Sequence, residues 1–133
     1  MLPFGLPLRL ATLCVVASIA LAACGGPAAS LAPAMPAPSG AVAVEAREYS
    51  FTPASVTVPA GEVTFWVKNA GNEAHEFEIL QGTTPVAPKV DAFGVGLTRE
   101  LKVTLAAGSY TLICGLNGHD QLGMKATLTV TGG

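Results

Sequence analysis

The most constraining feature of this sequence is the segment Tyr110 to Met124, which places three potential metal donors at regular spacing between two strand-like runs. The thiol of Cys114, the imidazole of His119 and the thioether of Met124 lie within eleven residues. Glycines interrupt this stretch and predict a loop. The residues on both sides alternate between apolar and polar types, which is typical of strands. Two strands joined by such a loop would hold the three donors at one end of a β-structure.

The donors available after residue 41 match the needs of a single metal site. That part of the chain contains one Cys, two His and one Met. His75 shares a strand face with Phe77 and Ile79, because alternate side chains of a strand point the same way. Taken alone, such a histidine can be structural if its ring nitrogens are satisfied. Combined with Cys114 and His119 it becomes a candidate ligand, since a thiolate, two imidazoles and a distant thioether are the donors of a trigonal copper site.

The chain after residue 41 has the pattern of short strands separated by turn residues. Almost no stretch shows the period of an amphipathic helix. This spacing predicts an all-β domain, an antiparallel sandwich or barrel. The region Gln81 to Gly96 is less regular and fits a short helix or a long connection equally well. Besides the two strands that flank the donor loop, Tyr110–Cys114 and Lys125–Val130, the predicted strands are Val42–Tyr49, Ser55–Val58, Glu62–Lys68, His75–Leu80 and Leu97–Leu105.

The first 41 residues have the composition of export and tethering segments. Arg9 is the only charge before a run of apolar residues, and Leu21-Ala22-Ala23-Cys24 resembles a bacterial lipobox. We therefore expect a lipoprotein signal peptide at residues 1–23, lipidation of Cys24, and a disordered Ala- and Pro-rich linker at residues 24–41. A plain apolar leader or an uncleaved anchor is the alternative. The folded domain is expected at residues 42–133, exported to the periplasm or the cell exterior and anchored to the membrane.

Charge and cysteine content narrow the functions open to the exported part. Six basic and nine acidic residues follow residue 24, which gives a net charge of −3. The sequence lacks a basic stripe with interleaved aromatics, which is the pattern that would indicate nucleic-acid binding. Cys14 would leave with the leader and Cys24 would carry lipid, so Cys114 has no partner for an intramolecular disulfide. The motif around Cys114 favours metal binding. The domain shows no evident Ser-His-Asp set or carboxylate pair, so we do not expect an enzyme.

A resemblance to the cupredoxins, the blue-copper fold of plastocyanin, azurin and auracyanin, is carried by the motifs Asn69-x-Gly71…His75-x-Phe77 and Tyr110-x3-Cys114-x4-His119-x4-Met124. It covers Val42 to the C-terminus and implies a Greek-key β-sandwich of about eight strands. It also implies one type 1 copper and one-electron transfer to a redox partner protein through the edge of His119. The implied ligands are His75, Cys114, His119 and, as the weak axial ligand, Met124. We expect a monomer.

A second resemblance, closer in detail, is to the cupredoxin-like domain of EfeO-type periplasmic iron-uptake proteins. Its segments are Phe51-Thr-Pro-Ala-Ser-Val-Thr-Val-Pro-Ala-Gly61, Glu76-Phe-Glu-Ile-Leu-Gln-Gly82 and Cys114-Gly-Leu116. The chain departs from plastocyanin and azurin at Glu76, where the residue after the first ligand is usually Asn and braces the Cys loop. We expect Glu76, Asn69 and Gly115 beside the ligands. Glu76 is expected as a solvated carboxylate, as part of a second metal position, or in place of an axial ligand.

Two functions fit these observations. The leading hypothesis is a membrane-anchored blue copper protein that carries single electrons in the cell envelope. The alternative is a copper- or iron-handling accessory lipoprotein, as the EfeO-like segments, Glu76 and Glu78 suggest. Leu116 and Leu122 are expected either as an apolar collar around His119 or packed on the end of the domain. A metal-free adhesion domain would require the four donors to coincide by chance.

Overall fold

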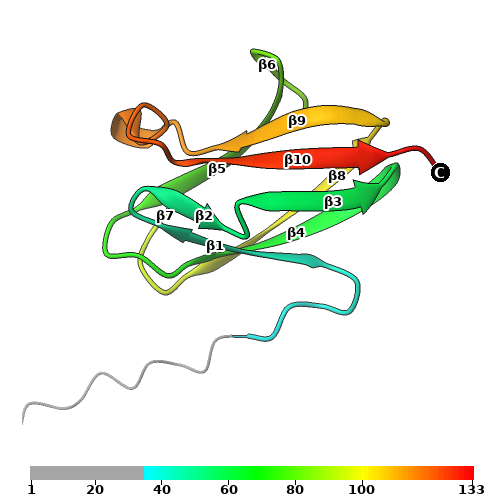
Figure 1. Cartoon of the computed structure of the whole chain (residues 1–133). Helices are drawn as coiled ribbons and strands as arrows, with labels where there is room; N and C mark the ends of the chain where they lie inside the picture. The colour runs from blue at the N-terminus through cyan, green and yellow to red at the C-terminus, as the bar shows by residue number, and fades with distance from the viewer. Residues whose placement is uncertain (1–34) are drawn as a thin grey trace, which may run out of the picture. The chain divides into compact units, whose positions relative to one another are not determined.

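A computed structural model describes residues 35–133 of the protein (Figure 1). The predicted signal peptide at residues 1–23, Cys24 and the linker as far as residue 34 lie outside these described residues. The last part of the predicted linker, residues 35–41, contains no strand or helix. Within residues 35–133, no helix is long and apolar enough to cross a membrane.

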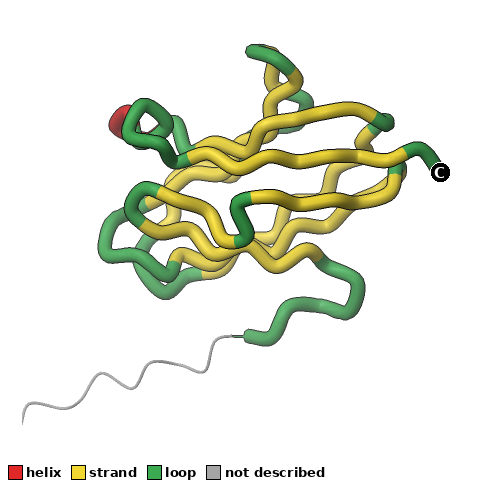
Figure 2. The backbone as a smooth tube through the Cα atoms, in the orientation of Figure 1, coloured by secondary structure: helices red, strands yellow, loops and turns green. Residues whose placement is uncertain are grey.

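The described residues form two β-sheets and one short 3₁₀ turn, η1 (Figure 2). One sheet has the order β2-β1-β4-β8, and the other has the order β3-β10-β9-β5-β6 with β7 also paired to β5. The predicted all-β sandwich is therefore confirmed, with ten strands instead of about eight because β2 and β6 are very short. The elements are β1 (Val42–Arg47), β2 (Ser50–Thr52), β3 (Ser55–Pro59), β4 (Gly61–Asn69), β5 (His75–Gln81), β6 (Thr84–Pro85), β7 (Val90–Phe93), β8 (Thr98–Leu105), β9 (Gly108–Ile113), η1 (Leu116–Gly118) and β10 (Lys125–Thr131).

The sheets are mixed, which corrects the prediction of a purely antiparallel sandwich. β1 runs parallel to β4, and β3 runs parallel to β10. The chain leaves the first sheet after β2 and enters the second as β3, so each N-terminal strand lies beside a strand that is distant in sequence. Alternation of apolar and polar residues is the same for parallel and antiparallel partners of a half-buried strand, so the pattern did not reveal this pairing.

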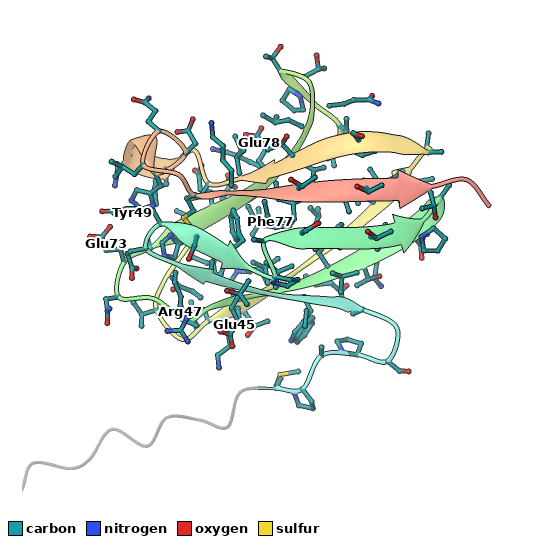
Figure 3. All side chains as sticks on the ribbon, in the orientation of Figure 1. Glu45, Arg47, Tyr49, Glu73, Phe77 and Glu78 are labelled. Atoms are coloured by element: carbon teal, nitrogen blue, oxygen red, sulfur yellow. The ribbon has the colours of Figure 1, made fainter. Side chains whose placement is uncertain are left out.

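Aromatic side chains from both sheets meet in the core. The ring centroid of Phe77 on β5, which is labelled in Figure 3, lies 5.6 Å from that of Phe51 on β2 and 5.4 Å from that of Phe65 on β4. His75, Phe77 and Ile79 are all buried, as predicted for this face of β5. Each aromatic pair contributes about 1 kcal/mol beyond its buried area. These contacts pack the sheet that carries His75 against the other sheet.

Residues 81–96, where a helix or a long connection was expected, contain the two short strands β6 and β7 and no helix. β7 pairs with the start of β5, with His75 opposite Phe93 and a register shift between His75 and Phe77. Phe93 is 1% exposed. The region therefore covers the strand edge at which His75 begins.

Four connections meet at one end of the sandwich, on the left in Figure 1. They are residues 48–49 between β1 and β2, 70–74 between β4 and β5, 94–97 between β7 and β8, and 114–124 between β9 and β10. Backbone hydrogen bonds join the third connection to the end of β4, from Asn69 N to Leu97 O and from Gly96 N to Asn69 O. This loop end is where the predicted ligands lie.

Candidate metal centre

Three of the four predicted ligands converge at the loop end. Donor atoms of His75, Cys114 and His119 lie within 4.8 Å of one another, and this is the one such cluster of His, Cys, Asp or Glu side chains in residues 35–133. His75 is the first residue of β5, Cys114 follows β9, and His119 caps η1. His75 and Cys114 are fully buried and His119 is 3% exposed. One sulfur and two nitrogens from buried side chains fit a type 1 copper site.

Both imidazoles turn the same nitrogen toward the thiol. Cys114 Sγ lies 3.9 Å from His75 Nδ1 and 3.6 Å from His119 Nδ1. The two rings cross edge to face with centroids 5.3 Å apart. Nδ1 offers a lone pair to a metal only when the ring proton is on Nε2. The partners of the two Nε2 atoms therefore decide whether the rings are ready to bind.

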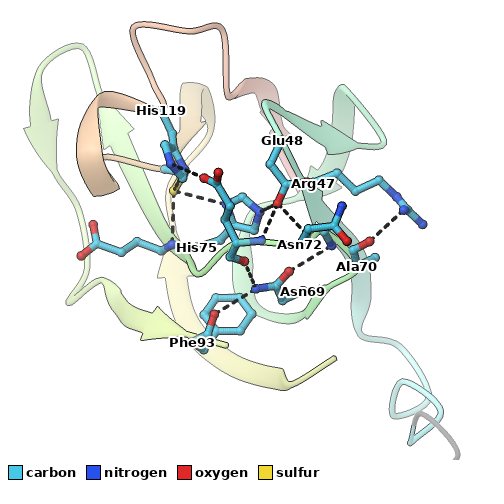
Figure 4. A network of polar contacts seen from close by, with 12 residues as sticks. Arg47, Glu48, Asn69, Ala70, Asn72, His75, Phe93 and His119 are labelled. Atoms are coloured by element: carbon cyan, nitrogen blue, oxygen red, sulfur yellow. Dashed lines mark hydrogen bonds and ion pairs between the residues drawn. The ribbon is translucent and has the colours of Figure 1, made fainter. Parts of the chain in front are cut away.

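Glu48 is the partner of His75 Nε2 (Figure 4). Its Oε1 lies 3.0 Å from that nitrogen and also accepts hydrogen bonds from the backbone N–H groups of Asn72 and Glu73, at 2.7 and 2.8 Å. Against the opposing effect of desolvation, these hydrogen bonds, led by that from Glu73, lower the pKa of Glu48 from 4.5 to about 2. An ionised carboxylate can only accept hydrogen bonds. His75 Nε2 therefore carries the proton, and its Nδ1 presents a lone pair to Cys114.

Burial shifts the pKa of two of the candidate ligands. Desolvation lowers the pKa of His75 below 6.5, although the hydrogen bond to Glu48 opposes this effect. Desolvation raises the pKa of Cys114 above 9.0, against hydrogen bonds from the backbone N–H groups of Glu76 and Leu116. At neutral pH the imidazole of His75 is therefore uncharged and the thiol of Cys114 is protonated. A metal could bind to the uncharged imidazole of His75 directly, and it would displace the proton of Cys114.

Glu76 contacts the site through its backbone, and its side chain turns to a lysine. Glu76 N donates a hydrogen bond to Cys114 Sγ at 3.2 Å. Its Oε1 accepts one from Lys89 Nζ at 2.8 Å, and this contact raises the pKa of Lys89. The Glu76 side chain is 13% exposed. The carboxylate is thus neither freely solvated nor part of the donor cluster, and the prediction had not considered an ion pair.

His119 is covered by residues that were not predicted to take part. The ring of Tyr49 packs edge to face on it with centroids 5.0 Å apart, and Glu73 Oε2 lies 3.3 Å from its Nε2. Tyr49 and Glu73 lie together at the loop end in Figure 3. Leu116 packs against the core and Leu122 is 60% exposed. The side of His119 away from Cys114 thus meets an aromatic ring and a half-exposed carboxylate.

Met124 is fully buried at the end of the loop that carries Cys114 and His119. Its backbone N donates to His119 O at 3.0 Å, and its carbonyl accepts from Cys114 N at 3.2 Å. Its role as a weak axial ligand stays a prediction. Gly118 and Gly123 have φ of +78° and +102°, as expected for glycines in a tight loop. Gly115 has φ of −81°, an ordinary helical value, so positive φ does not explain it.

Asn69 organises the loop that leads to His75. It is fully buried at the end of β4. Its Nδ2 donates to Glu73 O at 2.7 Å and to Phe93 O at 3.0 Å, while its Oδ1 accepts from Gly71 N at 3.0 Å (Figure 4). Asn69 thus contacts the backbone of the loop before His75 and of β7, which pairs with His75. Its role beside the ligands stays a prediction.

Sequence reasoning missed Glu48 and Tyr49, although both belong to the predicted strand Val42–Tyr49. The structure ends this strand at Arg47, so the two residues form the turn before β2. Glu48 is 27 positions from His75, and no local spacing links them. Their position follows from the parallel pairing of β1 with β4, which places Ala46 opposite Asn69 and which the sequence pattern did not reveal.

Comparisons with known proteins agree with this geometry. The cupredoxin-like domain family matches residues 14–130. The iron uptake system component EfeO of Yersinia pestis is 32% identical over 92 residues, which cover 69% of this chain and 24% of that protein. The chain thus spans about a quarter of the length of this relative.

Similar solved structures share the fold. Reduced auracyanin from Roseiflexus castenholzii has a TM-score of 0.63 at 22% identity, with 70% of this chain and 98% of that chain covered. Auracyanin A, a blue copper protein from Chloroflexus aurantiacus, has a TM-score of 0.60 at 22% identity, with 68% and 98% covered. A copper-containing nitrite reductase from Thermus scotoductus also has a similar region, with a TM-score of 0.52 at 22% identity over 68% of this chain and 22% of that one.

The family match agrees with the two-sheet fold and with the His-Cys-His cluster. The nitrite reductase shows that a region of an enzyme can have this fold. The match extends over most of the chain and includes all three clustered donors. The chain therefore belongs to the cupredoxin-like family.

Proposed function

We propose that this protein is a type 1 copper protein that carries single electrons in the cell envelope. His75, Cys114 and His119 would hold the copper, and Met124 would be its weak axial ligand. Bound copper would supply a one-electron couple. The observation that carries the proposal is the pair of Nδ1 atoms directed at Cys114 Sγ, at 3.9 and 3.6 Å.

The packing of the three donors supports electron transfer over other uses of a metal. All three are buried, and they come from the ends of paired strands or a short turn between them. Soft and borderline donors together accept both Cu(I) and Cu(II). A site held by such a scaffold moves little when the charge of the metal changes. We assign the chain no catalytic activity, because both histidines serve as ligands in this proposal.

The optical spectrum of the copper-loaded protein tests the proposal. Residues 42–133 with Cu(II) should give an intense blue colour that disappears on reduction and returns on oxidation. Cys114→Ser should remain folded, because the change is nearly isosteric, and should be colourless, because the colour arises from the thiolate. Thr111→Ser, a hydroxyl-retaining change on the same strand, should stay blue. A wild-type protein that binds Cu(II) without colour would contradict a type 1 site.

We also propose that the domain is exported and tethered to the membrane by lipid on Cys24. The lipobox-like Leu-Ala-Ala-Cys sequence and the Ala- and Pro-rich stretch behind it support this placement. Cells grown with radiolabelled fatty acid should label the wild-type protein and should not label Cys24→Ala. Cys14→Ala, which changes a leader cysteine, should be labelled like the wild type. Labelling that persists in Cys24→Ala would exclude this anchor.

A copper- or iron-handling accessory is the second candidate, and the similarity to EfeO over 92 residues favours it. EfeO is an iron uptake component, so this reading predicts binding of iron or transfer of copper. The donor cluster favours copper, because thiolate and imidazole are poorer ligands than oxygen for a hard cation such as Fe(III). Equilibrium dialysis of the protein against each metal separates iron handling from the two functions that use copper. Tighter binding of Fe(III) than of Cu(II) would favour the iron-uptake reading.

A further inference from the structure

We propose that Glu48 is a positioning residue that holds His75 ready for metal and whose negative charge lowers the reduction potential of bound copper. This inference rests on the proposed copper site. Glu48 was not among the predicted site residues, and no contact in residues 35–133 places it directly in the donor cluster. It would act through His75, from the side of the ring that faces away from Cys114.

Several contacts hold the Glu48 carboxylate in one position. Its side chain is 22% exposed, and one oxygen accepts from His75 Nε2 and from two backbone N–H groups of the loop before β5. Gly71 closes the pocket, because a Cβ atom at that position would collide with the Glu48 carboxylate. The loop is thus shaped around this carboxylate, and the carboxylate is held against the imidazole.

The first consequence concerns the proton on His75. A buried imidazole that had its proton on Nδ1 would direct an N–H group at Cys114 and would face an acceptor with a lone pair on Nε2. Glu48 makes that arrangement unfavourable, because two acceptors would then face each other. The other tautomer places the proton between Nε2 and Glu48 and leaves Nδ1 free.

The second consequence concerns charge. A carboxylate that accepts the second N–H of a ligating imidazole makes the ring a stronger donor, and removing such partners typically changes metal affinity by about 10- to 100-fold. A stronger donor and a nearby negative charge favour Cu(II) over Cu(I), because Cu(II) has the larger positive charge. The same carboxylate also binds the loop backbone, so a role limited to holding the loop is the alternative to be tested.

Glu48→Gln separates these roles. The amide oxygen can still accept from the loop N–H groups and from His75 Nε2, while the charge is gone. The ratio of Cu(II) to Cu(I) affinity should fall about tenfold, which corresponds to a potential about 59 mV higher. Glu73→Gln should give a smaller rise, since Glu73 is 53% exposed and makes one contact to His119 at 3.3 Å. An unchanged potential in Glu48→Gln would overturn the charge part of the proposal.

Glu62→Gln is the matched control, because it removes the same charge from the opposite end of β4. It lies seven residues from Asn69, roughly 23 Å along the strand at about 3.3 Å per residue. Its potential should equal that of the wild type. A rise as large as that of Glu48→Gln would mean that only net charge matters, which would overturn a role for the contact with His75.

A metal-free measurement tests the tautomer separately from copper binding. Nitrogen-15 NMR of the apoprotein should show His75 protonated on Nε2 in the wild type and in Glu48→Gln. Glu48→Leu, which removes the acceptor, should show a mixture of tautomers. A single Nε2–H tautomer in a folded Glu48→Leu would overturn the positioning role. If the wild type failed to bind copper, the proposed function would fail, and this measurement would still report on Glu48.

Discussion

Replacing Asn69 by Ala tests whether the loop that leads to His75 is held by one buried side chain. The amide is fully buried and makes three hydrogen bonds, to Glu73 O, Phe93 O and Gly71 N, of 2.7, 3.0 and 3.0 Å. Each hydrogen bond contributes about 1 kcal/mol net, and the partners left behind are backbone groups that would lose their bond in a place with little water. We therefore expect Asn69→Ala to lower the free energy of unfolding by about 3 kcal/mol.

The measurement is urea denaturation of the metal-free domain, followed by the fluorescence of its one tryptophan, Trp66. A loss of about 3 kcal/mol corresponds to a fall in melting temperature of roughly 12–24 °C for a domain of this size. Asn72→Ala is the matched control, since it is an exposed Asn in the same loop. Its change should stay within about 0.5 kcal/mol. An Asn69→Ala domain as stable as this control would refute the reasoning, because the three bonds would then contribute nothing.

Three further tests address the packing of the core, the proton on Cys114 and the shielding of His119 by Tyr49. Phe77→Ala should destabilise the domain by about 3–5 kcal/mol, because it removes a fully buried ring that joins the sheets, and denaturation of the purified variant would measure this loss. Binding of Cu(II) at pH 7 should release a proton from Cys114, whose raised pKa keeps the thiol protonated, so affinity should rise with pH below that pKa. Calorimetry in buffers of different ionisation enthalpy measures the release, and no release would mean that the thiol is not a ligand. Tyr49→Ala should expose the edge of His119 and speed oxidation of the copper-loaded protein by a small soluble oxidant in stopped-flow measurements, and a slower reaction would show that the tyrosine does not shield this edge.

Local patterns predicted the strands because burial of one face imposes a period of two. The alternation of His75, Phe77 and Ile79 is a property of the sequence, and the structure buries all three. The direction of each strand's partner is not a local property. The parallel pairs β1 with β4 and β3 with β10 depend on how the chain crosses between sheets, so they could not be read from alternation.

The candidate ligands could be predicted from the sequence because the chain after residue 41 contains few Cys, His and Met residues. With one Cys, two His and one Met after residue 41, the candidate ligands were few, and the loop between β9 and β10 already held three of them. The structure brings His75 to Cys114 and His119, as expected. Met124 is buried in the loop that carries Cys114 and His119, and its coordination remains a prediction.

The sequence by itself determined the all-β architecture and the identity of the candidate donors, because residue type and spacing carry that information directly. Only the tertiary structure decided what surrounds the donors: Glu48 on His75, Tyr49 and Glu73 on His119, and Lys89 on Glu76. All four of these contacts join different strands or loops. A contact of this kind depends on the relative positions of two separately folded segments, and no pattern within either segment specifies it.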